Sequence, residues 1–395
     1  MDGAARARGR WRGGAAVLGL ALILTLAPAT RASAATLTLA ASRTSLEFGE
    51  ATTLSGSVAP APPPGTTVEI VEADAPGGVL ASASTDGSGS FSVDLAPDRN
   101  VRVAARVGPD QSPPVQLLVR PKLTARLTGV RLFGTAVVSG RLEPDHPDAT
   151  VKVTLFRGDK VAGRADASVA GSEYAAELTI LRPGRYRAQA SFHDQDHEPV
   201  EASTEASRVT APPPLNGGSN GRWVAVLEQR LRDLHYVVPR PNRGFDHRTG
   251  DAVLAFHKVH GMRRVESVSP ATWKRLANPR TPGPRSKSQK VHIEIDQSKQ
   301  VLFVVRQGEI DEIVHTSTGA GGATRDGVFK VHRKIAGYSP NRLYYPSYFD
   351  GLRAVHGWPD VPPTNASHGC SRVPYWTAKH LFSIMGYGME VRVYH

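Results

Sequence analysis

The side chain with the greatest capacity for chemistry in this sequence is Cys370, the chain's one cysteine. It lies within Ser-His-Gly-Cys-Ser-Arg at residues 367–372, and a second histidine, His356, precedes this segment. Residues 1–34 have the pattern of an export signal, so the mature chain is expected in an oxidising compartment. There a lone cysteine either pairs with another chain or serves as a reactive thiol. The neighbouring histidines and glycines favour the reactive thiol.

The residues around this thiol suit acyl transfer. An ordinary thiol has a pKa of about 8.5 and is only a few per cent ionised at neutral pH. A nearby imidazole can take its proton, and a third group is needed to fix the imidazole tautomer. Gly369 lets the backbone approach a substrate closely or adopt a positive φ. Backbone N–H groups beside Cys370 could then bind an oxyanion, which makes the cluster competent for thioester chemistry.

Metal binding and simple packing are the competing interpretations. One cysteine with scattered histidines lacks the usual spacing of zinc ligands, and a buried structural cysteine is the plainer alternative to a nucleophile. His257 and His260 stand one turn apart on a predicted helix, but no carboxylate or thiol lies at a fitting spacing. We expect these two to be surface histidines, and the sequence predicts no metal site.

Residues 1–34 read as a secretory signal peptide, with a small-residue cleavage site at Ala32-Ser33-Ala34. Its apolar run, residues 15–27, is shorter than the roughly 20 residues that span a bilayer. We therefore expect a secreted, cell-wall protein with no stable transmembrane segment after cleavage; an uncleaved anchor is the alternative. The positive region before the apolar run consists of Arg6, Arg8, Arg10 and Arg12.

The net charge of +12 is concentrated in one region. Residues 220–289 carry 14 Lys and Arg against 5 Asp and Glu, a net +9. A basic surface can bind nucleic acid, but an exported protein rarely meets it, so no nucleic-acid partner is expected. An anionic cell-wall polymer fits better, and a solvated basic face without a partner is the alternative.

The elements that carry the site come last in a chain of several domains. Residues 36–210 alternate short Val- and Thr-rich runs with Pro, Gly and Asp clusters, the pattern of all-β sandwiches. The pattern repeats at an offset of 83 to 84 residues, which predicts two copies, at 35–120 and 121–210. They resemble bacterial immunoglobulin-like modules, which implies spacing or wall contact. The matching segments are 53–58 with 136–142, 67–70 with 150–153, and 91–95 with 174–178.

Two linkers, 211–221 and 278–289, flank a predicted three-helix module at 222–277. Val224, Leu227 and Leu231 fall on one helix face, and Ser269-Pro270 starts the third helix. The module resembles the small peptidoglycan-binding domain found beside wall enzymes, and this resemblance implies peptidoglycan as its ligand. Histidines at 235 and 257 replace that domain's usual glycine and glutamine. The matching residues are 226–231, His235-Tyr236, Phe245-Asp246, Thr249, Ala252-Val253, Phe256 and Thr272-Trp273.

Residues 290–395 are predicted to form a mostly-β domain with one main helix, residues 375–385. Two of its segments resemble the catalytic domain of the L,D-transpeptidases. Residues 316–331 resemble that family's "TG…TPxGxF" stretch, with Arg325 in place of the proline. His356-Gly357 followed by residues 366–373 resembles its His…SHGC signature, with Ser371 in place of an apolar residue. The predicted strands are 291–296, 301–305, 310–316, 327–332 and 391–394.

The resemblance implies roles for eight residues. Cys370 would be the nucleophile, and His356 the general base, oriented by the carbonyl of Gly357. His368 would shape the oxyanion site or bind substrate, and Arg372 would pair with a substrate carboxylate or brace the loop. The remaining residues implied to bind or orient substrate are Ser367, Gly369 and Ser371.

The implied reaction forms a thioester from the third residue of a peptidoglycan stem peptide with release of D-alanine. A neighbouring stem's side-chain amine then makes the cross-link. No metal or cofactor is expected, and carbapenems should acylate Cys370. Hydrolysis by an L,D-carboxypeptidase, attachment of protein to peptidoglycan, and a non-catalytic wall-binding role remain open.

Overall fold

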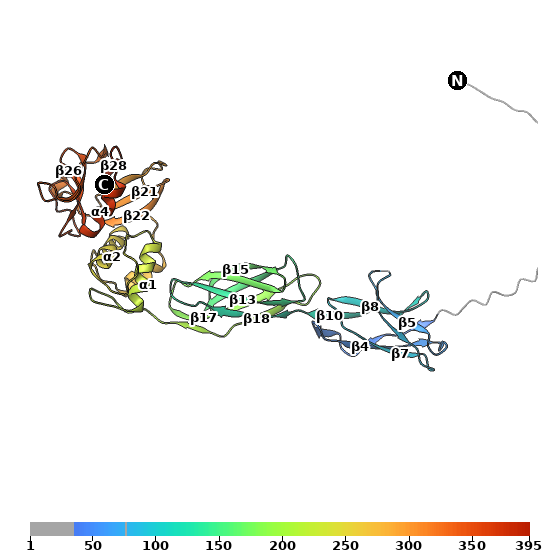
Figure 1. The fold of residues 1–395 in the computed structure, drawn as a ribbon. Coiled ribbons are helices and arrows are strands. Elements are labelled where there is room, and N and C mark those ends of the chain that lie inside the picture. The colour runs from blue at the N-terminus through green and yellow to red at the C-terminus, as the bar shows by residue number, and fades with distance from the viewer. Residues whose placement is uncertain (1–34, 76) are drawn as a thin grey trace, which may run out of the picture. The chain divides into compact units, whose positions relative to one another are not determined.

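The computed structural model describes residues 35–75 and 77–395, so the predicted signal peptide lies outside the described residues. The chain is a multidomain, mostly-β protein with several sheets and one segment of three helices (Figure 1). Two compact units emerge from its contacts. Of the described residues, the first consists of 35–44, 52–95 and 102–116, and the second of 45–51, 96–101 and 117–395. No helix among the described residues is both long and apolar enough to cross a membrane.

The first unit contains β-strands in two sheets. Strand β4 pairs with β1, β2 and β7, while β5 pairs with β6 and β8, and β9 pairs with β8. Alternate residues of β4 are buried, which is the period-two pattern expected of a strand with one face on a core. Strands β3 (Ser45–Glu47) and β10 (Val115–Arg120) pair in parallel through residues 45–47 and 118–120, which belong to the second unit. The other bounds are β1 Thr36–Leu37, β2 Ala40–Ala41, β4 Thr52–Ala59, β5 Thr67–Glu72, β6 Val79–Ser84, β7 Ser90–Leu95, β8 Val101–Val107 and β9 Asp110–Gln111.

The second unit begins with a larger β module in which the sheet order is β11-β13-β16-β15-β14-β17-β18, with β12 on β13 and β19 on β17. Its pairings repeat those of the first module: β13 with β16 matches β4 with β7, and β14 with β15 and β17 matches β5 with β6 and β8. The bounds are β11 Lys122–Leu123, β12 Arg126–Thr128, β13 Thr135–Glu143, β14 Thr150–Arg157, β15 Lys160–Ala170, β16 Glu173–Thr179, β17 Gly184–Phe192, β18 Val200–Ser203 and β19 Ser207–Val209.

One glycine recurs for a steric reason in both modules. A Cβ on Gly56 would lie 2.0 Å from the backbone oxygen of Thr38, and one on Gly140 would lie 1.9 Å from that of Thr124. No side chain fits at such a distance, so glycine is required at both positions.

Three helices follow, as predicted: α1 (Arg222–Asp233), α2 (His247–Val259) and α3 (Pro270–Ala277). Asp246 caps α2 by accepting from the backbone N–H groups of Arg248 and Thr249. Ser269 and Thr272 form a reciprocal capping box on α3. The local signals in the sequence therefore account for where α2 and α3 begin, whereas α1 starts after Gly221 without a side-chain cap.

The helices and the C-terminal domain share one hydrophobic core, although residues 278–289 were predicted to separate two domains. Leu227, Leu231 and Phe256 pack in the same cluster as Phe303 and Ile313 of the C-terminal sheet. The backbone joins them as well, since the N–H of Val237 donates to the Ile313 carbonyl at 3.0 Å. We infer that each part depends on the other for burial of its apolar face.

A buried lysine adds a polar link between these two parts. The ammonium of Lys258, on α2, donates to the carbonyls of Gln300 and Thr316 at 3.0 and 2.9 Å, and to His315 Nδ1 at 2.6 Å. Burial lowers the pKa of Lys258 to about 6. The three N–H groups of the ammonium nevertheless each have one acceptor, and these hydrogen bonds favour the charged form. Thr316 also hydrogen-bonds the segment that follows Cys370, through the Arg372 carbonyl. Lys258 therefore connects α2 to the candidate site through Thr316.

The C-terminal domain consists of two sheets and one helix. One sheet has the order β22-β21-β20-β28-β23 and the other β24-β25-β26-β27, with α4 (Tyr375–Ile384) close to β25 and β26. The predicted helix is present, but the whole second sheet was missed. The bounds are β20 His292–Asp296, β21 Val301–Arg306, β22 Glu309–His315, the short 3₁₀ turn Ala320–Gly322, β23 Gly327–Lys330, β24 Arg333–Lys334, β25 Tyr344–Asp350, β26 Arg353–Trp358, β27 Ser371–Pro374 and β28 Glu390–Tyr394.

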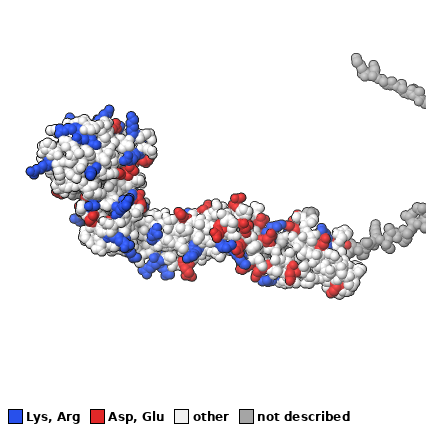
Figure 2. All heavy atoms as spheres, viewed as in Figure 1, with Lys and Arg blue, Asp and Glu red and all other residues white. Residues whose placement is uncertain are grey.

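Charge follows this division of the chain. In the view of Figure 2, Lys and Arg side chains predominate over the helices and the C-terminal domain, whereas both signs mix over the β modules. This agrees with the basic excess counted for residues 220–289.

Candidate active site

The parallel pairing of β26 with β27 brings the histidine and the cysteine together. His356 on β26 lies opposite Arg372 on β27, and Cys370 directly precedes β27. Side chains alternate along a strand, so Cys370 and Arg372 share a face. Residues opposite one another in a parallel pair also share a face, which places His356 on that same face.

His356 is buried with a defined tautomer. Its Nδ1 lies 2.9 Å from the carbonyl oxygen of Gly357. Because a carbonyl only accepts, Nδ1 carries the proton, and Nε2 of the neutral ring is left with a lone pair. Burial lowers the pKa of His356 to about 4, and the charge of Arg372 acts in the same direction. The ring is therefore neutral at pH 7 and able to accept a proton.

The thiol of Cys370 is half-buried, and its Sγ lies 3.8 Å from the carbonyl oxygen of Leu352. Burial raises the pKa of the Cys370 thiol, and this outweighs the opposite effect of the charges on Arg372 and Arg353. The resting pair at neutral pH is thus a thiol with a neutral imidazole. This arrangement suits proton removal during attack rather than a preformed thiolate–imidazolium pair.

The turn before Cys370 is held in a conformation that requires glycine. Gly369 has a φ of 128°, and a Cβ there would lie 3.0 Å from both the Ala323 carbonyl oxygen and Arg353 Nε. The Ser367 hydroxyl donates to the Cys370 carbonyl at 2.5 Å and accepts from the Gly369 N–H at 3.1 Å. The Thr324 hydroxyl donates to the Gly369 carbonyl at 2.9 Å. These hydrogen bonds fix the backbone conformation of residues 367–370, and so the position of the thiol.

Ser371 lies on the opposite face of the strand, away from Cys370. Its hydroxyl is fully buried and bonds the Thr316 hydroxyl at 2.6 Å, and Thr316 also donates to the Arg372 carbonyl at 2.7 Å. Backbone bonds between Ser317 and Arg372, at 2.9 and 3.0 Å, join the same two segments. Ser371 therefore holds β27 against the segment that contains Thr316.

The two remaining predicted residues differ in their surroundings. Arg372 places its guanidinium 5.1 Å from the ring centre of Trp358. The ring centres of Trp358 and His356 lie 5.6 Å apart, with the two rings nearly perpendicular. Within the described chain Arg372 makes no ion pair, so its charge remains available to a bound anion. His368 is exposed beside the turn.

Sequence reasoning missed an ionic cluster next to the nucleophile. Asp350 accepts from Arg325 and from Arg353, the latter at 3.0 Å, and Arg353 also donates to the Ala323 carbonyl at 2.8 Å. The bond from Arg325 holds the pKa of the Asp350 carboxyl below its ordinary value. Arg325, noted only as a replacement for proline, thus helps to fix the turn that packs on Gly369. No spacing in the sequence signals this pairing.

His257 and His260 are buried, so the expectation of surface histidines was wrong. His257 bonds the Val265 carbonyl at 2.7 Å and the Thr272 hydroxyl at 2.9 Å. His260 bonds the Phe256 carbonyl at 2.8 Å and accepts from the Arg280 N–H at 3.0 Å. All four ring nitrogens have protein partners, so none is left for a metal ion.

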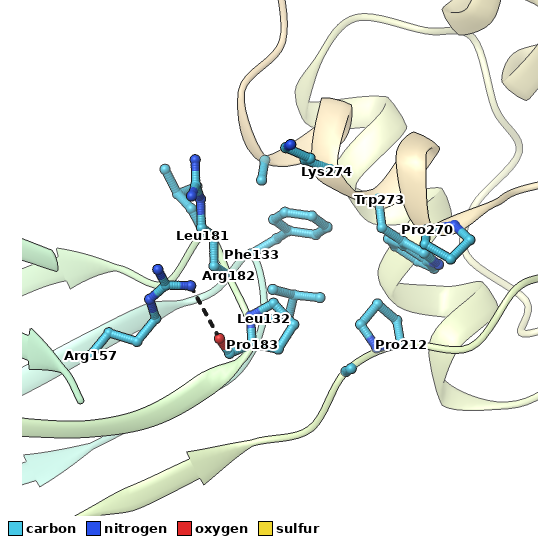
Figure 3. A pocket seen from close by; sticks show the side chains of 12 residues that line it. Leu132, Phe133, Arg157, Leu181, Arg182, Pro183, Pro212, Pro270, Trp273 and Lys274 are labelled. Atoms are coloured by element: carbon cyan, nitrogen blue, oxygen red, sulfur yellow. Dashed lines mark hydrogen bonds between the residues drawn. The ribbon is translucent and has the colours of Figure 1, made fainter. Parts of the chain in front are cut away.

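Two cavities lie near the helices. One of about 680 Å³ extends from Trp358 to α2 and is lined by three carboxylates and several aromatic rings, which would favour a cationic ligand. The other, of about 270 Å³, has Phe133 and Trp273 facing one another and no cysteine, histidine or carboxylate in its lining (Figure 3). The carboxylates of the first cavity belong to Asp251, Glu266 and Asp360.

A thiol just before one strand and a neutral imidazole on the adjacent strand are groups that cysteine-based acyl transfer requires. The sequence profile of the YkuD family, described as the L,D-transpeptidase catalytic domain, matches residues 290–393. The chain belongs to the L,D-transpeptidase family through this domain. The predicted resemblance is confirmed at that level.

Solved structures similar to this chain include three L,D-transpeptidases. That from Xylanimonas cellulosilytica is 33% identical over 47% of this chain and 99% of its own, with a TM-score of 0.45. That from Stackebrandtia nassauensis is 24% identical over 47% and 97%, with a TM-score of 0.31. That from Mycobacterium smegmatis is 12% identical over 69% and 100%, with a TM-score of 0.24. A search of curated proteins gave no match.

Proposed function

We propose that this protein is an exported L,D-transpeptidase that cross-links the third residues of peptidoglycan stem peptides through a thioester on Cys370. The observation that carries the proposal is the β26–β27 register, which puts Cys370 and a buried, neutral His356 on one face. The family of residues 290–393 supports peptidoglycan as the substrate.

In the first half-reaction, Cys370 Sγ attacks the carbonyl that joins the third residue to the terminal D-alanine. His356 Nε2 takes the thiol proton, since Nδ1 is already committed to the Gly357 carbonyl. The Gly369 N–H already donates to the Ser367 hydroxyl, and Ser367 and Thr324 hold the turn, so in this proposal the N–H of Cys370 stabilises the oxyanion. The imidazolium then gives its proton to the departing D-alanine amine.

In the second half-reaction, the side-chain amine of another stem attacks the thioester. His356 accepts the amine proton, the thiol is regenerated, and the new amide joins two third residues. His368 is exposed beside the Cys370 turn, and Arg372 offers a positive charge for a stem carboxylate. We assign both to substrate binding rather than to proton transfer.

In this proposal the β modules and the three helices, which precede the catalytic domain, locate the enzyme in the cell wall. The two β modules are immunoglobulin-like spacers, and residues 222–277 bind peptidoglycan through their basic surface. Carbapenems act as inhibitors by acylating Cys370. One similar solved structure is a carbamoyl enzyme formed with avibactam.

Mass spectrometry of reaction products distinguishes the proposal from its alternatives. The mature protein is incubated with purified tetrapeptide muropeptides, with and without a candidate acceptor protein. Cross-linked dimers that have lost one D-alanine are the expected product. Tripeptides alone would indicate a carboxypeptidase, muropeptide adducts on the protein would indicate attachment, and no product would indicate a binding protein.

Cys370→Ala is the decisive variant, because the sequence has no second thiol to replace it. It should lose cross-linking and carbapenem adducts while unfolding like the wild type. Ser383→Ala, an exposed position on α4, is the control and should keep both activities. Residual cross-linking by Cys370→Ala would disprove the thioester mechanism.

A further inference from the structure

A cluster of two histidines and one aspartate lies in the second β module, far along the sequence from the cysteine. His146 belongs to the connection between β13 and β14, and Asp194 and His197 to the connection between β17 and β18. None of the three has a role in the proposed reaction. Their sequence separation explains why motif reading predicted no metal site.

Three side-chain atoms of this cluster converge. His146 Nε2 lies 3.2 Å from His197 Nδ1. Asp194 Oδ2 lies 3.2 Å from His146 Nε2 and 3.0 Å from His197 Nδ1. Tetrahedral zinc, with bonds of about 2.0–2.1 Å to nitrogen and oxygen, separates its ligand atoms by about 3.3 Å. The triangle therefore has nearly the dimensions of one face of such a site.

A backbone carbonyl fixes the tautomer of each histidine by accepting from the ring nitrogen that is not part of the triangle. His146 Nδ1 lies 2.9 Å from the Pro144 carbonyl oxygen, and His197 Nε2 lies 2.9 Å from that of Asp98. Carbonyls only accept, so the protons of the neutral rings are on these outer nitrogens. The two inner nitrogens then face each other with lone pairs and cannot bond one another. Metal-binding histidines characteristically donate their other N–H in this way.

Burial makes the arrangement costly without a positive charge between the two rings. The His197 side chain is only 5% exposed, and the ring of Phe192 meets that of His146 edge-on at 5.1 Å. His146, Asp194 and His197 all line a cavity of about 640 Å³, which leaves room for water as a further ligand. A protonated histidine paired with Asp194 is the competing explanation.

We propose that His146, Asp194 and His197 bind one Zn²⁺ ion as a structural site of the second β module. Two neutral imidazoles and a carboxylate suit zinc, and water would complete the tetrahedron. The ion would tie the β13–β14 connection to the β17–β18 connection, with the backbone at Asp98 supporting His197. The site is independent of the transpeptidase proposal.

Zinc binding by the tag-free mature chain, residues 35–395, tests this. After removal of metal with a chelator, calorimetric titration should give one Zn²⁺ per chain, and zinc should raise the midpoint of thermal unfolding. His146→Gln and His197→Gln should weaken binding by more than about tenfold, the loss seen even when supporting residues of metal sites are changed. The control is His193→Gln, an exposed histidine beside Asp194, which should bind as the wild type does.

Cobalt provides a measurement that does not depend on the folding of the variants. Co²⁺ added to the wild-type chain should give the visible absorption of a tetrahedral nitrogen–oxygen site, and Zn²⁺ should remove it. Unchanged melting with zinc, no cobalt spectrum, or equal zinc binding by His146→Gln and His197→Gln would each overturn the proposal. The first two of these outcomes would favour the protonated histidine–aspartate pair.

Discussion

Replacing Gly369 with alanine tests whether the turn before Cys370 positions the nucleophile. The change forces a side chain into a backbone with a φ of 128°. It also puts a Cβ 3.0 Å from the Ala323 carbonyl oxygen and from Arg353 Nε. Arginine side chains can move, but the Ala323 backbone is held by its bond from Arg353 and lies beside Thr324, which bonds Gly369 itself. The turn must therefore shift.

The expected magnitude has two parts. A side chain in a backbone region favoured by glycine costs about 1–3 kcal/mol of folding free energy. A shift of about 1 Å in the reacting atom costs about 10²-fold in rate, because the attack geometry is lost. Gly369→Ala should thus lose about 1–3 kcal/mol of stability and about 10²-fold in acylation rate.

Stopped-flow acylation by a carbapenem, together with urea unfolding, measures both quantities. Gly351→Ala is the matched control: its φ is 54°, but its Cβ would contact nothing within 4 Å. That variant should lose some stability and acylate normally. Wild-type acylation by Gly369→Ala would refute the positioning role, and equal loss in both variants would show that the steric contact is irrelevant.

Three further predictions concern the same protein. His356→Ala should slow acylation by about 10²–10⁴-fold, the usual contribution of a positioned base, and His368→Ala should cost less; the reverse order in pre-steady-state rates would exchange their roles. Because the pKa of His356 is lowered to about 4, the acylation rate should fall only as pH drops through about 4. Because the pKa of Cys370 is raised, the ultraviolet absorbance of the wild type at pH 7 should show no thiolate when compared with Cys370→Ala. A thiolate signal at neutral pH would contradict the neutral pair. Residues 211–395 carrying Cys370→Ala should bind peptidoglycan sacculi, more weakly as salt rises, because the excess charge is basic; protein left in the supernatant at low salt would remove the wall-binding assignment.

Much of the site could be predicted because its signals are local. The motif of residues 367–372 and the preceding His356 indicated the candidate reacting groups. The Gly357 carbonyl was expected to orient the imidazole, and it accepts a hydrogen bond from His356. The depressed pKa of His356 could not be predicted, because it arises from burial by neighbouring strands. Ser371 was expected to bind or orient substrate; the bond of its buried hydroxyl to Thr316 depends on strand packing and could not be predicted from the sequence.

The sequence alone determined the repeated β modules, the three helices and the identity of the thiol, since period-two and helical patterns and capping residues act over a few positions. Tertiary structure decided what depends on distant pairings. It set the register of β26 with β27, which had not been predicted as strands, and it merged the helices with the C-terminal sheet into one core. It also gathered His146, Asp194 and His197 from separate loops. Such contacts depend on which apolar surfaces are buried against one another in the folded chain. No local pattern of residues specifies those pairings.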